Sequence, residues 1–245
     1  MVIPNDPSDA SMKVDPATLD LLQNGEFVSC ELTPLGSNYT FVSCIQLGDR
    51  TGRAIYKPRD GEVPLWDFPR GTLYKREVAA YLLSEILGWD FIPLTIIREG
   101  PYGVGSVQLY VDHDPSLNYH TLTDADADAL RLIACYDLVA NNTDRKANHV
   151  LVDANRKLWG IDQGLTFHAD TKIRTCIWDF CGEPILQPQL DALASLFKQL
   201  PRPQARLQEL LDLLLPEEVE ALHQRLRWVL TEKVYPGLPG SRRRR

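Results

Sequence analysis

The sequence lacks several features that would place it in a specialised class of protein. Its five cysteines form no C-x-x-C pair, so neither a zinc site nor a disulfide framework is expected. This use of cysteine fits a reducing compartment, and we predict a cytoplasmic protein. No run of about 18 apolar residues occurs, so we predict that no segment spans a membrane.

Basic residues are also few relative to acidic ones. The chain holds 26 Lys and Arg against 33 Asp and Glu, and its net charge is −7. Four of the basic residues are the arginines 242–245, within a basic tail over 239–245, so the body of the chain is more acidic still. An acidic body argues against a nucleic-acid partner. Residues 1–14 hold few apolar side chains and are predicted to be disordered. We expect the protein to be a monomer.

The apolar residues that are present outline a first half rich in strands. They make up 44% of the 245 residues, which is enough for one large domain or two lobes. Apolar alternation between turn-forming residues predicts five strands, and helical spacing predicts a helix that ends before Gly88. The elements expected in chain order are a short helix at 16–23, strands at 27–33, 39–47 and 53–56, the helix at 73–87, and strands at 94–98 and 106–111.

The second half has a helical pattern. A capping box at Thr123 opens a helix that is apolar nearly all round and runs to about Asn141, so we expect it to be buried. A hairpin over 149–152 and 158–161 follows, and the chain is helical beyond Pro188. The second half is therefore expected to be mainly helical.

The composition changes near residues 112–120. This change predicts an N-lobe over 15–112 and a C-lobe over 113–238. The fold class expected from these elements is α+β, with an antiparallel sheet and one helix in the first lobe and a mainly helical second lobe.

Four polar residues lie at the ends of these elements or within the helix of the first half. Lys57 ends the third strand, and Glu77 lies in the helix that follows. Asp144 follows the buried helix, and Asp162 follows the hairpin. Nucleotide phosphates need a fixed lysine, Mg²⁺ binds one or two carboxylates plus phosphate oxygens, and a hydroxyl nucleophile needs a proton acceptor. One site that supplies all of these is a phosphoryl-transfer site.

Several short motifs carry a family resemblance. NNTDRKANHVLV at 141–152 resembles the catalytic loop of type II phosphatidylinositol 4-kinases, and GIDQGLTF at 160–167 resembles their metal-binding I-D-x-G segment. AIYKP at 54–58 resembles the phosphate-lysine strand, and GSVQLYV at 105–111 resembles the hinge entry. Over roughly residues 33–165, the chain is similar to the phosphatidylinositol 3-/4-kinase-like branch of the protein-kinase superfamily. The resemblance implies a two-lobed protein-kinase-like fold with the nucleotide between the lobes.

The resemblance also implies ATP and Mg²⁺ (or Mn²⁺) as cofactors. Lys57 would contact the α- and β-phosphates, with Glu77 as its ion-pair partner. Backbone groups would enclose the nucleotide, those of Gly36, Ser37 and Asn38 over the phosphates and those of Gln108, Leu109, Tyr110 and Val111 at the adenine edge.

The remaining implied roles concern the transfer itself. Asp144 would accept the proton of the substrate hydroxyl or orient that hydroxyl, and Asp162 would bind the metal. Arg145 and Lys146 would lie near the transferred phosphate or the substrate.

The sequence departs from the family pattern at three places. The second metal ligand, Asn five residues after the catalytic Asp, is replaced by His149, while Asn148 lies one residue early. Either Asn148 binds the metal or His149 does, which would favour Mn²⁺. No G-x-G-x-x-G occurs, so Gly36 alone would serve the phosphate loop. No basic cluster for a phosphoinositide headgroup stands out after Asp162, so lipid is the least favoured acceptor.

The function predicted from these residues is an ATP-dependent phosphotransferase that transfers the γ-phosphate to a hydroxyl of a protein or a small polyol. Two alternatives stay open. One is a pseudokinase that binds nucleotide or protein without turnover, which His149 in place of Asn suggests. The other is an AMP transferase on a kinase fold.

Overall fold

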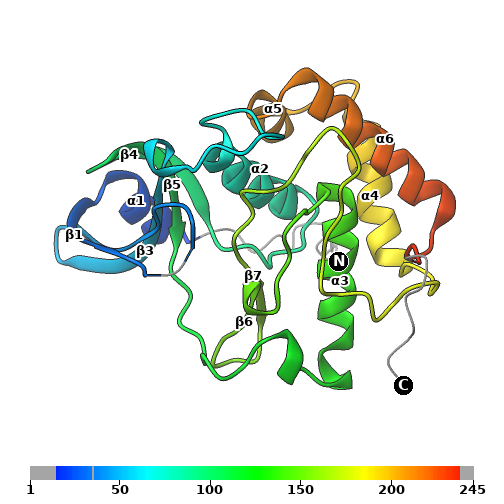
Figure 1. The fold of residues 1–245 in the computed structure, drawn as a ribbon, viewed down its shortest axis with the longest axis horizontal. Coiled ribbons are helices and arrows are strands. Elements are labelled where there is room, and N and C mark those ends of the chain that lie inside the picture. The colour runs from blue at the N-terminus through cyan, green and yellow to red at the C-terminus, as the bar shows by residue number, and fades with distance from the viewer. Residues whose placement is uncertain (1–14, 35, 238–245) are drawn as a thin grey trace, which may run out of the picture.

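The protein is described by a computed structural model that covers residues 15–34 and 36–237. The predicted disordered segment 1–14 and the basic tail 239–245 lie outside the described residues. A five-stranded antiparallel sheet fills one side of the molecule and helices fill the other, as expected for two lobes (Figure 1). Within 15–34 and 36–237, no helix is both long and apolar enough to cross a membrane.

The sheet has the strand order β1-β2-β3-β5-β4. All five predicted strands are present, with ends shifted by a few residues. The third strand begins three residues earlier than predicted, at Arg50, because Gly48, with a φ of +58°, allows a two-residue turn between Leu47 and Arg50. The strands are β1 (Glu26–Leu32), β2 (Phe41–Leu47), β3 (Arg50–Pro58), β4 (Thr95–Gly100) and β5 (Gly103–Leu109), and α1 (Pro16–Asn24) precedes them.

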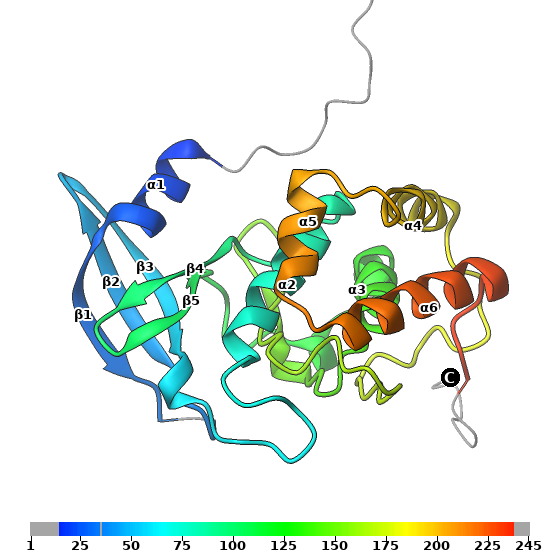
Figure 2. The ribbon, with the colours of Figure 1, turned by 90° about the horizontal axis from the view of Figure 1, so that it is seen from above.

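Helix α2 (Leu73–Ile86) connects the sheet to the helical side (Figure 2). Its end lies where the sequence predicts, because Gly88 adopts a left-handed φ of +67°. Arg76 forms a buried ion pair with Glu218 of α6 (Pro216–Glu232). Tyr136 of α3 (Ala127–Ala140) donates a hydrogen bond of 2.8 Å to the carbonyl of Ala80. These contacts fix the helix that carries Glu77.

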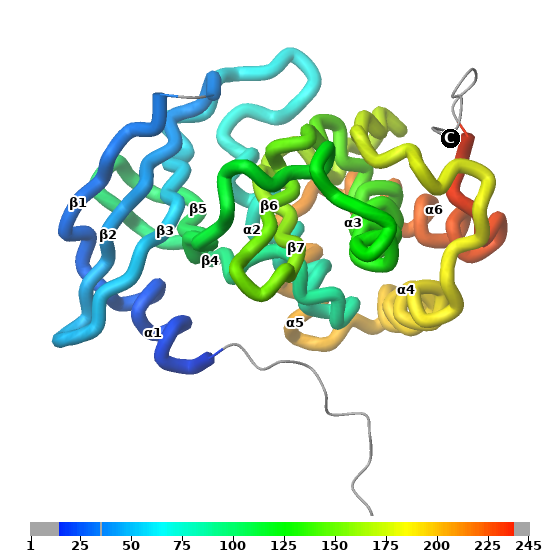
Figure 3. The backbone as a smooth tube through the Cα atoms, turned by 90° about the horizontal axis from the view of Figure 1, so that it is seen from below, coloured from blue at the N-terminus to red at the C-terminus, as the bar shows by residue number. Residues whose placement is uncertain are grey.

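The helical lobe is built around α3. The expected helix begins later than predicted, because residues Asp124–Asp126 form a 3₁₀ turn before it. It ends at Asn141, whose φ of +51° turns the chain out of the helix. The hairpin β6 (Val150–Val152) and β7 (Leu158–Gly160) lies between the sheet and α3 (Figure 3). Helices α4 (Gln187–Gln199), α5 (Ala205–Asp212) and α6 complete the lobe.

Candidate active site

A cavity of about 330 Å³ lies between the sheet and the hairpin. Its volume falls within the range of small-molecule sites, roughly 300–1,000 Å³. Residues from every predicted part of the site line it. The predicted site residues in the lining are Gly36, Ser37, Asn38, Lys57, Glu77, Gln108, Leu109, Tyr110, Val111, Asp144, Lys146, Asn148, His149 and Asp162.

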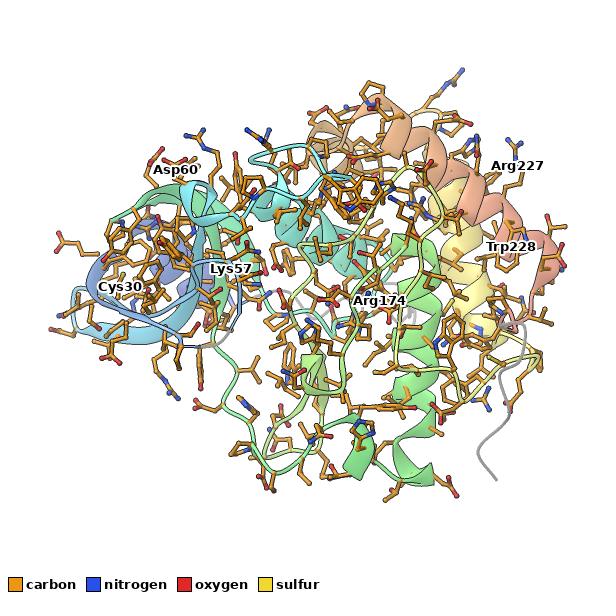
Figure 4. The ribbon with its side chains drawn as sticks, in the orientation of Figure 1. Cys30, Lys57, Asp60, Arg174, Arg227 and Trp228 are labelled. Carbon is orange, nitrogen blue, oxygen red and sulfur yellow. The ribbon has the colours of Figure 1, made fainter. Side chains whose placement is uncertain are left out.

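Lys57 lies between two carboxylates at the inner end of the cavity. Its ammonium pairs with Glu77 and donates a hydrogen bond of 2.8 Å to Oδ1 of Asp162. Burial acts to lower the pKa of Lys57, but the negative charges of Asp162 and Glu77 outweigh it, and the pKa lies above its ordinary value. The side chain is therefore a fixed cation. Figure 4 shows Lys57 at the sheet.

Asp162 is held in an unusual backbone conformation. Its φ of +59° is uncommon for a residue with a side chain, and such positions gather at functional sites. The next residue, Gln163, donates its backbone N–H to Oε2 of Glu77 at 2.9 Å, so Glu77 holds both Lys57 and the loop after Asp162. The charge of Lys57 lowers the pKa of Asp162 well below its ordinary value, against the effect of burial. The carboxylate is therefore ionised, and it lies in the cavity lining.

The second oxygen of Asp162 faces His149. Nε2 of His149 lies 3.3 Å from Oδ2 of Asp162. Burial lowers the pKa of His149 below its ordinary value, although Asp162 acts in the opposite direction, so the imidazole is neutral at pH 7. A neutral imidazole beside a carboxylate can ligate a divalent metal. Asn148 also lines the cavity, so both candidates for the second ligand face the same cavity as Asp162.

The donor set fits a metal that is bound together with phosphate. Among residues 15–34 and 36–237, no group of three His, Cys, Asp or Glu side chains forms a metal cage. Mg²⁺ with a nucleotide needs no such cage, because phosphate oxygens and water supply the remaining ligands. Asp162 with His149 or Asn148 meets that requirement.

Asp144 lines the cavity from the loop after α3. Its backbone N–H donates to Oδ1 of Asn142 at 3.0 Å, which fixes the loop. One carboxylate oxygen, Oδ2, is 2.7 Å from Nζ of Lys146, and the other, Oδ1, accepts a hydrogen bond of 3.1 Å from Arg174. The carboxylate is thus placed at the cavity with two cations beside it.

Arg145 lies elsewhere, which corrects the expectation that it is near the transferred phosphate. It is absent from the cavity lining, and its side chain is fully buried beneath the loop. Its guanidinium pairs with the carboxylate of Asp137 at 2.9 Å and donates to the carbonyl of Ile161 at 3.2 Å. Asp144 lines the cavity, whereas the ion pair with the buried Asp137 holds the side chain of its neighbour Arg145 in the interior.

The two segments that are predicted to enclose the nucleotide are held by local contacts. Gly36 has a φ of +102°, which a residue with a Cβ rarely adopts. Oδ1 of Asn38 accepts the N–H of Val63 at 2.7 Å, so this side chain ties the loop to its neighbour. Gln108 is buried, and its side chain donates to the hydroxyl of Thr95 on the neighbouring strand β4 at 2.9 Å.

Two further residues at the site escaped the sequence reasoning. Glu62 lines the cavity, and its Oε1 accepts the N–H of Tyr74 at the start of α2 at 2.8 Å. Arg174 reaches Asp144 from 30 residues further along the chain. The spacing of Lys172 and Arg174 in an extended segment is the one sequence signal that could have indicated cations on a shared face.

The fold of this protein is protein-kinase-like. The Golgi casein kinase with Mn/ADP bound has the same fold, with a TM-score of 0.56 and 16% sequence identity over 88% of this chain and 74% of that one. The proinflammatory kinase CtkA of Helicobacter pylori aligns with 13% identity and a TM-score of 0.45 over 87% of this chain and 94% of that one.

A protein of Mycobacterium tuberculosis gives the family. Protein Rv2133c is 38% identical over 252 aligned residues, which cover 86% of this chain and 90% of that protein. The chain therefore belongs to the family of Rv2133c. No family model matches it.

Proposed function

We propose that this protein is an ATP- and divalent-metal-dependent phosphotransferase. One observation carries the proposal. The ammonium of Lys57, held between Glu77 and Asp162, faces the same cavity as the Asp144 carboxylate. A fixed cation for phosphate, a metal ligand and a proton acceptor around one nucleotide-sized cavity are the parts that phosphoryl transfer needs.

Each residue has a defined task in this proposal. Lys57 holds the phosphates of ATP, and Asp162 with His149 or Asn148 holds Mg²⁺ or Mn²⁺, which neutralises charge on the phosphate oxygens. Asp144 accepts the proton of the acceptor hydroxyl. The acceptor oxygen forms a bond to the γ-phosphorus, the bond from that phosphorus to the β–γ bridging oxygen breaks, and ADP leaves with the electron pair.

The type of phosphotransferase is inferred from the sequence motifs. The catalytic-loop and metal-loop sequences favour a phosphatidylinositol 3-/4-kinase-like enzyme that acts on a hydroxyl of a protein or small molecule. The Mn/ADP bound to the Golgi casein kinase supports the choice of nucleotide and metal for this fold. His149, at the position of a metal-binding Asn, favours a pseudokinase as the second candidate.

The test is incubation of the purified protein with ATP labelled at the γ-phosphate, with Mg²⁺ and Mn²⁺ in separate reactions. We expect labelled protein or released phosphate, and we expect Asp144→Ala and Asp162→Asn each to lower the rate by roughly a hundredfold or more. A parallel reaction with ATP labelled at the α-phosphate separates AMP transfer from phosphate transfer.

Asp128→Asn is the matched control. Asp128 is an exposed carboxylate in the first turn of α3 and does not line the cavity, so this variant should retain full activity. Nucleotide binding without turnover under either metal would favour the pseudokinase. Equal activity in the wild type and the Asp162→Asn variant would contradict the metal assignment.

A further inference from the structure

The Asp144 carboxylate has an inner and an outer neighbour. Lys146, bound to Oδ2, lines the cavity and therefore faces the nucleotide. Arg174, bound to Oδ1, is not among the cavity residues, and its side chain is 78% exposed. Figure 4 shows Arg174 on the helical side of the molecule and Lys57 at the sheet. Arg174 thus lies on the outer side of Asp144, from which an acceptor hydroxyl would approach.

The backbone of Arg174 is fixed on both sides. Its N–H donates to the carbonyl of Asn142 at 2.9 Å, and its carbonyl accepts the N–H of Arg145 at 3.0 Å. The next residue, Thr175, donates its hydroxyl to the buried carboxylate of Asp137 at 3.0 Å. The segment is therefore anchored to the catalytic loop, while the guanidinium extends into solvent. A backbone fixed in this way places the exposed guanidinium at a defined point beside Asp144.

The charges around this segment single out Arg174. Lys172 lies two residues earlier, and its ammonium is bound to Asp67 at 3.0 Å. Lys146 faces the cavity. The hydrogen bond of Arg174 to Asp144 uses one of the five N–H donors of a guanidinium, whose fork matches a carboxylate or phosphate. Arg174 is thus the cation with spare donors on the acceptor side.

The pairing of Arg174 with Asp144 contributes little to folding. An ion pair with one highly exposed partner adds little stability because water and salt screen it. It does have a chemical consequence, since it occupies a lone pair of the carboxylate that must accept the hydroxyl proton. An acceptor that offered its own anionic group to Arg174 would release Oδ1 of Asp144 for that proton.

We propose that the acceptor carries a carboxylate or phosphate next to its hydroxyl, and that Arg174 binds this group. The proposal rests on the proposed phosphotransferase function and names its substrate class. Binding of the anion to Arg174 frees Asp144, which takes the hydroxyl proton as the acceptor oxygen bonds to the γ-phosphorus and ADP departs. A neutral polyol leaves Arg174 on Asp144 and is a poor acceptor.

The test compares acceptor pairs that differ only in charge. One arm uses a serine peptide flanked by glutamates against the same peptide with glutamines, and the other uses glycerol 3-phosphate against glycerol. We expect the anionic member of at least one pair to have a kcat/KM about tenfold higher or more, as a charge-assisted hydrogen bond provides. The arm that responds identifies whether the anion is a carboxylate on a peptide or a phosphate on a small molecule.

Variants of Arg174 assign the preference to this residue. Arg174→Gln should abolish the difference between the two members, and Arg174→Glu should favour a lysine-flanked serine peptide. Arg156→Gln is the matched control, because Arg156 is also an exposed arginine paired with a mostly buried aspartate, Asp126. It should retain the wild-type preference.

Binding is measured alongside turnover, so that the two proposals can fail separately. Calorimetric titration with the glutamate peptide and with glycerol 3-phosphate requires no catalysis, and Arg174→Gln should weaken binding by about tenfold. The inference is overturned if the anionic and neutral acceptors bind and react equally well. It is also overturned if the preference for the anionic acceptor survives Arg174→Gln. If the wild type neither turns over nor binds ATP, the proposed function is overturned instead.

Discussion

The guanidinium of Arg145 and the carboxylate of Asp137 form an ion pair at 2.9 Å in which both side chains are fully buried. The same guanidinium donates to the carbonyl of Ile161 at 3.2 Å, next to Asp162. The carboxylate also accepts from Asn142 at 3.1 Å. This pair therefore sets the spacing between the loop of Asp144 and the loop of Asp162. Arg145 acts as a support for the site rather than as a ligand of the phosphate.

We predict that Asp137→Asn destabilises the protein by about 3–5 kcal/mol, because it leaves the buried charge of Arg145 without its partner. Urea-induced unfolding followed by circular dichroism measures this free energy. Asp20→Asn, which breaks the exposed pair with Arg50, should leave the urea concentration at the midpoint of unfolding unchanged. A small effect of Asp137→Asn would mean that the pair is not needed to hold the two loops.

We predict that Glu77→Gln lowers kcat by roughly a hundredfold while the protein stays folded. The change removes the charge that holds Lys57 and weakens the acceptor for the N–H of Gln163, so both the lysine and the metal loop lose their position. Steady-state kinetics with ATP gives kcat and KM. Glu85→Gln, on the same helix but paired with Arg206, is the comparison and should have wild-type kinetics. Identical kinetics for both variants would argue against a role for the Lys57–Glu77 pair.

We predict that His149→Asn lowers the ratio of Mn²⁺-supported to Mg²⁺-supported activity by about fivefold or more. The imidazole 3.3 Å from Asp162 favours a transition metal, whereas an amide oxygen favours Mg²⁺. Initial rates over a series of concentrations of each metal give the ratio. Asn148→Ala tests the neighbouring candidate in the same assay. If only Asn148→Ala changes the metal dependence, then Asn148 is the second ligand.

We predict a slow and strongly pH-dependent reaction of Cys176 with iodoacetamide. Burial raises the pKa of the Cys176 thiol to about 11, so the reactive thiolate is about 0.1% of the thiol at pH 8. Since the pKa is raised, the rate should climb about tenfold for each pH unit between 8 and 10, where an ordinary exposed thiol levels off. Mass spectrometry of peptides after timed alkylation measures the rate. Fast labelling at pH 8 would show that the segment holding Arg174 opens readily.

The sequence determines much of the fold and of the site. Strand and helix periodicity gives the order of the elements, because the apolar residues must fall on buried faces. The predicted site residues Lys57, Asp144 and Asp162 follow or end those elements, and the structure places all three in the lining of one cavity. A short motif can be recognised from the sequence because all of its residues lie on one loop.

Contacts between distant segments were decided only by the tertiary structure. The sequence does not indicate that Arg145 turns inward to Asp137 while its neighbour Asp144 faces the cavity. It also gives no sign that Arg174 reaches Asp144, because that contact requires the segment after Asp162 to pack along the catalytic loop. The physical reason is that periodicity records whether a side chain is buried, whereas the partner of a charge depends on which segments the core brings together.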